Sequence, residues 1–293
     1  SGDGYALLRP RHAGQSFLEF REEKDPDARA AAVAGGRADF ALDPPLPAVR
    51  DAGKDRRFSI FSWSTSLCVV FLIRCDRPPL DDPKVRLAFN LGLDRERLIR
   101  EVLYGFGRPL NGPLSDRHFG RDPSVPPHPY DPGRALRLLR AAGLEEGFPL
   151  QVHAPCSIPD EGPRLAKFAA EGLRALGIDA RPVLHEDRTE YARKIAAGEL
   201  DGVFCFDSSP PGTCKVLREK LDSRTRGPWW QGYHNDEFDA LLSQAAETVD
   251  GRARREIYFK AYGILHREAP WIFLYQPARF WIGTKRNTPA AGF

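Results

Sequence analysis

An aspartate stands where a strand-like run passes through a short loop into a helix. The segment DGVFCFDSSPPGT at residues 201–213 begins with small and aromatic residues typical of a strand. Its loop side holds Phe206, Asp207, Ser208 and Ser209. Such loops place side chains at the carboxyl edge of an open α/β sheet, where proteins of this class hold ligands. These residues are therefore candidate binding residues. The alternative, left open here, is that Asp207 only caps the turn before the helix.

Aromatic side chains follow in GPWWQGY at residues 227–233. Trp229, Trp230 and Tyr233 offer large, rigid apolar surfaces with polar tips, which suits a pocket for varied side chains. We expect them near the same sheet edge. We also expect at least one of the two tryptophans to fill the core instead.

Known patterns of catalytic and metal-binding residues are absent from the sequence. It has no GxSxG elbow, GxGxxG turn or P-loop, and no histidines paired at i, i+4. His153 is more typical of a packed polar residue than of a ligand, and His234 and His266 of surface or helix-face groups. A nucleophilic Cys205 or Cys214 would need a nearby base that nothing identifies. We predict no enzyme activity, no cofactor and no metal site.

The five cysteines show no CxxC pair and no metal-finger spacing. The simplest interpretation is that they are small buried hydrophobic residues. A disulfide is the alternative, either Cys68–Cys205 or Cys205–Cys214, and an odd total leaves at least one free thiol. The cysteines are Cys68, Cys75, Cys156, Cys205 and Cys214.

Composition indicates a globular protein of one large or two ordinary domains. The chain has 293 residues, of which 42% are hydrophobic and 28% charged, and no apolar run is long enough to span a bilayer. The net charge of +3 comes from basic residues scattered among acidic ones. This pattern argues against a nucleic-acid surface.

Strand-like and helical segments alternate along the chain, which predicts an α/β sheet. Residues 58–74 hold two short strands, and residues 105–129 form a connection rich in glycine and proline. Further strands are predicted at 148–154, 178–185, 201–206, 271–276 and 279–284. Helices are predicted at 84–104, 132–142, 160–176, 188–197, 213–221, 235–248 and 251–267.

The stretch RPPLDDPKVRLAFNLGLDRERLIR at residues 77–100 predicts a helical hairpin. Asp81 or Asp82 can cap the first helix, Pro83 suits its first turn, and Asp94 starts the second helix. Apolar residues recur at helical spacing on both. These positions are Val85, Ala88, Phe89, Leu91, Leu93, Leu98, Ile99, Val102 and Leu103.

This stretch resembles the signature PPxxDxxVRxAxxxxxDRxxLI of the family 5 solute-binding proteins of ABC transporters, the peptide, opine and nickel binders. Other segments are similar to further motifs of that family. They are the turn SGDGY at 1–5, DARAAAVAGGRADFAL at 27–42 with helical Ala28–Val33 and a strand over 38–42, YDPGRALRLLRAAGL at 130–144, residues 164–201, GYHNDEFDALLSQA at 232–245 and APWIFLYQP at 269–277. The chain is identified as a member of this family.

The resemblance implies a type II periplasmic-binding-protein fold with two lobes and a hinge. The first lobe would hold residues 1–73 and 271–293, and the second lobe residues 74–270. Trp271, Phe273 and Tyr275 are expected in the first lobe's sheet. The family pattern normally begins upstream of the SGDGY turn, so we expect an incomplete first lobe, with a further chain completing it as one option.

The resemblance also implies a function and a role for particular residues. In related peptide binders an aspartate after the corresponding strand pairs with the ligand's amino group, and Asp207 stands nearest that place. Trp63 and Thr65 would line the cleft from the first-lobe side. The chain would bind a short peptide or peptide-like molecule, deliver it to an ABC permease and act in the periplasm or cell envelope. The alternatives are a regulator's sensing domain and an enzyme or accessory protein built on the same fold.

Overall fold

The chain folds into two compact units. A computed structural model describes residues 4–12, 15–157 and 161–285, and their side chains from residue 19 onward. The first unit comprises Ser1–Ser64 with Ala278–Phe293, and the second comprises Thr65–Pro277. Residues 65–73 and 271–277, which the sequence analysis assigned to the first lobe, belong to the second of these units.

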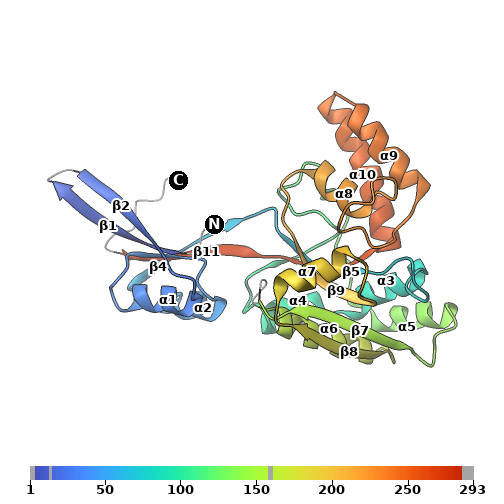
Figure 1. The fold of residues 1–293 in the computed structure, drawn as a ribbon, viewed down its shortest axis with the longest axis horizontal. Coiled ribbons are helices and arrows are strands. Elements are labelled where there is room, and N and C mark those ends of the chain that lie inside the picture. Colours follow the sequence, from blue (N-terminus) through green and yellow to red (C-terminus); the bar gives the residue numbers. More distant parts are fainter. Residues whose placement is uncertain (1–3, 13–14, 158–160, 286–293) are drawn as a thin grey trace. The chain divides into compact units, whose positions relative to one another are not determined.

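The first unit is an antiparallel sheet with two short helices. Its strands run in the order β2-β1-β3-β11-β4. Helices α1 and α2 both lie against the same side of this sheet (Figure 1). The elements are β1 (Gly4–His12), β2 (Gln15–Glu22), α1 (Pro26–Ala34), β3 (Phe40–Leu42), α2 (Leu46–Ala52), β4 (Phe58–Ser64) and β11 (Ala278–Thr284). Ser1–Asp3 of the SGDGY motif lie outside the described residues, and Gly4 and Tyr5 begin β1.

The second unit contains a mixed six-stranded sheet in the order β6-β10-β5-β9-β7-β8. Strand β7 is parallel to β8 and β9, whereas β5 is antiparallel to β9 and β10. Every residue of β5 and β10 is buried, as expected for central strands covered on both faces. The strands are β5 (Cys68–Ile73), β6 (Arg108–Pro109), β7 (Pro149–Pro155), β8 (Asp179–His185), β9 (Val203–Ser208) and β10 (Trp271–Gln276).

Helices connect and cover these strands (Figure 1). They are α3 (Pro83–Gly92), α4 (Arg95–Glu101), α5 (Pro132–Ala141), α6 (Gly162–Arg174), α7 (Arg188–Ala196), α8 (Thr213–Leu221), α9 (Asp236–Glu247) and α10 (Gly251–Glu268). Each helix and strand predicted from residue 58 onward is confirmed, with ends that shift by a few residues. The short β6 inside the predicted connection was not foreseen.

The helical hairpin is confirmed, and the structure shows that Asp82 rather than Asp81 caps its first helix. The Asp82 side chain accepts a hydrogen bond from the Lys84 amide, and Asp94 caps α4 through the Arg97 amide. All nine predicted apolar positions of the hairpin are buried. Two buried polar groups, Asn90 and Arg95, join this hairpin to β10: the Asn90 amide nitrogen donates to the Trp271 carbonyl over 2.9 Å, and Arg95 donates to the Phe273 carbonyl.

The expected place of Trp271, Phe273 and Tyr275 is wrong. All three lie in β10, which pairs with β5 and β6 in the sheet of the second unit. The run WIFLYQ is buried along its whole length. The backbone N–H and C=O groups of this buried strand require hydrogen-bond partners, and β5 and β6 supply them on its two sides.

The five cysteines are free thiols, so neither suggested disulfide is present. Strands β5 and β9 are neighbours, but their register sets Cys68 opposite Ser208 and Cys205 opposite Phe71. Burial raises the pKa of the Cys68 thiol to about 12 and that of Cys75 likewise, which is typical of inert core cysteines.

No described helix combines the length and apolar character that crossing a membrane requires.

Candidate functional site

Asp207 lies within β9 rather than in the loop after it. It is the second-last residue of the strand and pairs in register with Val69 of β5. Its carboxylate oxygen Oδ1 accepts a hydrogen bond from Nη2 of Arg188 over 3.0 Å, and the two side chains form an ion pair. The Asp207 side chain is 22% exposed and that of Arg188 is 43% exposed. The site therefore consists of a mostly buried carboxylate beside a half-exposed guanidinium.

Burial controls the protonation of Asp207. Removal from water raises the pKa of the Asp207 carboxyl, while Arg188 counteracts this only in part. A carboxylate in such surroundings is stabilised by any cation that can reach it, because the low local dielectric strengthens the attraction.

The residues on either side of Asp207 point to the opposite face of the sheet, since strand side chains alternate. There the Phe206 ring lies 4.9 Å from the Trp229 ring, measured between centroids. The Lys220 ammonium donates to the Ser208 hydroxyl over 3.2 Å and lies 5.1 Å from the Phe206 ring centre. Lys220 is 2% exposed, and burial lowers its pKa to about 8. This face is an apolar platform with one buried cation.

Backbone contacts hold the two segments that flank this edge. The Ser66 hydroxyl donates to the Ser209 carbonyl over 2.7 Å. The Gln276 amide donates to the Thr65 carbonyl over 3.0 Å, and the Thr65 hydroxyl accepts from the Leu67 amide over 3.2 Å. Ser209 and Thr65 thus lie beside the end of β9, where their partners restrain them.

The aromatic loop after α8 divides into surface and core residues. The Trp230 ring nitrogen donates to the Tyr233 carbonyl over 2.8 Å, and the Arg226 guanidinium lies 5.1 Å from the Trp230 ring. Tyr233 is 2% exposed and its hydroxyl donates to Glu268 over 2.9 Å. Trp229 and Trp230 are both half-buried, so the expectation that one of them fills the core is wrong. Tyr233 is the buried aromatic residue of this loop instead. Its hydroxyl can be buried because it donates a hydrogen bond to the Glu268 carboxylate.

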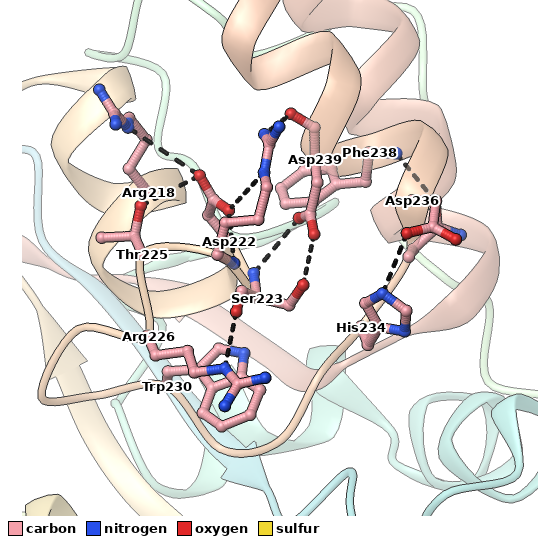
Figure 2. Close-up of polar contacts among 12 residues, drawn as sticks. Arg218, Asp222, Ser223, Thr225, Arg226, Trp230, His234, Asp236, Phe238 and Asp239 are labelled. Carbon is pink, nitrogen blue, oxygen red and sulfur yellow. Dashed lines mark hydrogen bonds and ion pairs between the residues drawn. The ribbon is translucent and has the colours of Figure 1, made fainter.

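The carboxylates of Asp222 and Asp239 hold the beginning of this loop, directly after α8 (Figure 2). The Ser223 hydroxyl donates to the Asp239 carboxylate at the start of α9. The Thr225 hydroxyl donates to the buried Asp222 carboxylate over 3.1 Å, and Arg218 forms an ion pair with that carboxylate at 3.9 Å. Together they hold the chain that leads to Trp229.

Trp63 belongs to the other unit. It lies in β4, is 38% exposed and meets Trp281 of β11 edge to face, with ring centres 5.6 Å apart. Both rings belong to the five-stranded sheet of the first unit.

The family model of the bacterial extracellular solute-binding proteins, family 5 (Middle), matches residues 17–204. The chain belongs to this family. Its fold is the α/β fold of the type II periplasmic binding proteins. HbpA2 from Haemophilus parasuis matches with a TM-score of 0.81 and 20% identity, over 92% of this chain and 54% of that one. The periplasmic binding protein DppA from Helicobacter pylori, in complex with the peptide STSA, matches with a TM-score of 0.80 and 21% identity, over 97% and 57%.

Curated family 5 relatives resemble the chain in sequence as well. Heme-binding protein A of Haemophilus influenzae is 28% identical over 254 residues, which are 84% of this chain and 46% of that protein. Di/tripeptide-binding protein 2 of Pseudomonas aeruginosa is 27% identical over 262 residues, or 87% of this chain and 49% of that protein. The chain spans about half the length of the curated relatives it matches.

Two charged residues of this family 5 chain escaped the sequence analysis. Arg188 and Asp207 are 19 positions apart in the sequence, and no local pattern predicts that they pair. Lys220 could have been found, because Val216, Leu217, Lys220 and Leu221 mark the buried face of α8. A lysine on such a face signals a buried charge.

The opposite end of the sheet carries a cavity of about 490 Å³. None of the candidate binding residues lines it; its wall includes Arg77, Leu80, Phe148, Gln151, Arg181 and Asp201. Asp201 and Gln151 lie where β9 and β7 begin, whereas Asp207 lies where β9 ends. The cavity and the Asp207 edge are therefore separate features of the second unit.

Histidines that are distant in sequence form two pairs. The ring of His153 lies within hydrogen-bond distance of His185, with Nδ1 and Nε2 3.0 Å apart, and His128 stacks on His266 with ring centres 3.9 Å apart. Within the described ranges, no three His, Cys, Asp or Glu side chains converge on a point suited to a metal ion.

Proposed function

We propose that the end of β9 is the binding site for the amino group of a short peptide or peptide-like molecule. The observation that carries this proposal is the Asp207 carboxylate. It is largely withdrawn from water at the carboxyl end of a central strand, and its present ion-pair partner is half-exposed. A ligand ammonium would form a charge-assisted hydrogen bond with it.

The surroundings suit the remainder of such a ligand. On the face of β9 opposite Asp207, Trp229 lies against Phe206 with the two rings tilted by 49°, and it supplies apolar area to a ligand that extends past the strand end. Backbone groups near Ser209 supply hydrogen-bonding capacity. The names of several relatives support the same ligand class: one binds di- and tripeptides, others bind glutathione, and a related solved structure holds the dipeptide Met-Leu.

We further propose that the complete protein serves an ABC importer in the periplasm or cell envelope, where it passes an unaltered ligand to a membrane permease. Membership of a solute-binding family supports binding without chemical conversion. A structural neighbour described as ABC transporter-associated and periplasmic supports the location.

The test is calorimetric titration of the purified chain with di-, tri- and tetrapeptides, followed by mass spectrometry of the recovered peptide. We expect saturable binding and an unchanged peptide mass. Asp207→Asn should weaken binding of peptides with a free amino group by about 2 kcal/mol or more, because it removes one charged partner of a desolvated pair.

Asp201→Asn is the matched control, since Asp201 is largely exposed at the other end of β9 and should leave affinity unchanged. Cleaved peptide in the recovered sample would refute binding without conversion. Equal losses in the two variants would refute the role of Asp207.

A further inference from the structure

Arg188 pairs with the carboxylate to which the proposed function assigns the ligand's amino group. It is the first residue of α7, and its Nη2 lies 3.0 Å from Oδ1 of Asp207. The two residues come from different elements, so this ion pair connects the start of α7 to the end of β9.

Helix electrostatics do not favour a cation at this position of α7. The amino end of a helix carries a partial positive charge, so a basic residue in its first turn is unfavourable. Asp187 already caps the helix by accepting hydrogen bonds from the amides of Thr189 and Glu190, at 2.8 and 3.0 Å. The ion pair with Asp207 offsets this unfavourable placement of the Arg188 charge.

The two partners differ in the free energy that each loses when the ion pair breaks. With 43% of its side chain exposed, Arg188 already keeps part of its hydration and loses less than Asp207 when the ion pair breaks. Asp207 is 22% exposed, and a buried carboxylate without a cation is costly. The pair is thus suited to an exchange in which one cation replaces another at a fixed carboxylate.

We propose that Arg188 is a specificity-determining residue that occupies Asp207 in the free protein and is displaced by the ligand's ammonium group. This inference rests on the proposed function. Arg188 lowers the affinity for every ligand that uses Asp207, and a ligand lacking a cation has no means of displacing it. The site then selects peptides and related molecules with a free primary amino group.

The experiment compares Arg188→Gln with the wild-type chain by calorimetry, using Ala-Ala-Ala and its N-acetylated form. We expect Arg188→Gln to bind the free tripeptide about three- to tenfold more tightly, as loss of a partly exposed competing pair implies. The affinity for the acetylated peptide should not rise. Nuclear magnetic resonance of the Asp207 carboxyl carbon should show a higher pKa in Arg188→Gln than in the wild-type chain.

Arg193→Gln is the control for a general loosening of α7. Arg193 lies on the same helix but forms its ion pairs with Glu190 of α7 and with Glu199 after the helix end. It should leave both affinities unchanged. Equal or weaker binding of the free tripeptide by Arg188→Gln would overturn the displacement, and so would an equal gain for the acetylated form.

Failure of the proposed function gives a different result. If the wild-type chain binds neither peptide while Arg188→Gln binds the free one, displacement is supported in its extreme form. If neither protein binds either peptide, both the peptide-binding function and the displacement are refuted. Binding by the wild-type chain without a gain in the variant refutes the displacement alone.

Discussion

Several charged side chains in the second unit are largely removed from water. A different set of neighbouring groups compensates each of these buried charges. Asp207 meets a guanidinium, and Arg95 donates to backbone carbonyls and to Asn90. Lys220 has weaker compensation, namely one hydroxyl and the face of an aromatic ring. Burial lowers the pKa of Lys220 to about 8, so the folded chain holds its charge at a cost.

Replacing Lys220 by methionine should therefore stabilise the protein at pH 7. Because the folded pKa is below the unfolded value, the cost is present below about pH 8 and is relieved as the pH rises. We expect a gain of about 1–2 kcal/mol at pH 7, within the range seen when buried charges are replaced by apolar groups. The gain should shrink at pH 9.5, measured by urea denaturation at both pH values.

Lys215→Met is the control, since Lys215 is exposed on the same helix and should change little. A loss of stability in Lys220→Met at pH 7 would mean that the Ser208 hydrogen bond outweighs the cost of burial.

Helix α7 determines where Arg188 lies, and its start depends on one side chain. Asp187 accepts hydrogen bonds from two amides of the first turn, which otherwise have no partner within the helix. Farther along, the Tyr191 hydroxyl donates to the Cys205 carbonyl over 2.9 Å and fastens α7 to β9. The helix is therefore held at its cap and on its buried face.

Asp187→Ala should cost about 1 kcal/mol of stability, the usual loss for an aspartate cap. Hydrogen exchange should accelerate most in the first turn of α7. Asp187→Asn should retain most of the stability, because its side-chain oxygen can still accept from the same amides. If both variants exchange equally fast, the carboxylate charge rather than the cap geometry holds the helix start.

At the scale of the molecule, and among the side chains that the structure describes, the histidines with lowered pKa values all lie in the second unit. Burial is the main cause for each, and it lowers the pKa of His128 to about 2 and that of His153 to about 4. His118, His185 and His266 shift in the same direction. His128 stacks on His266, and His153 lies within hydrogen-bond distance of His185. Because His128 and His153 are buried, protonation would place a charge in surroundings with little water.

The second unit should thus lose stability in acid. With folded pKa values below the unfolded value of about 6.5, the stability is complete above pH 6.5 and declines as the pH falls toward the folded values. At pH 5 each strongly shifted histidine should cost about 2 kcal/mol. Hydrogen exchange of β5 amides under increasing urea, at pH 7 and pH 5, reports on this unit.

His128→Phe tests the origin of the acid loss. A phenyl ring can keep the stack on His266 and Phe273, and it lacks the buried Nε2 atom, which has no partner in the structure. The loss between pH 7 and pH 5 should shrink by about 2 kcal/mol. His234→Phe, at an exposed position, should not change it. An undiminished loss in His128→Phe would assign the acid sensitivity to other groups.

Much of the fold was predictable because its signals are local. Capping aspartates, prolines in first turns and apolar residues at helical spacing placed α3 and α4, and buried runs placed β5 and β10. The sheet to which β10 belongs was mispredicted. An apolar run indicates that a strand is buried, but it does not indicate which of two sheets the strand joins. Asp207 was predicted as a residue of interest, but its position inside β9 depends on pairing with β5.

The sequence by itself determined the order and kind of the elements from residue 58 onward, and it also determined the family. Helix caps, hydrophobic periodicity and sequence motifs all depend on residues that are close together in the chain. The tertiary structure alone decided which groups meet: Arg188 with Asp207, Lys220 with Ser208, and His153 with His185. Such contacts join residues from separate elements, and they exist only once the sheet has brought those elements together. The electrostatics of the site therefore depend on packing that no local pattern encodes.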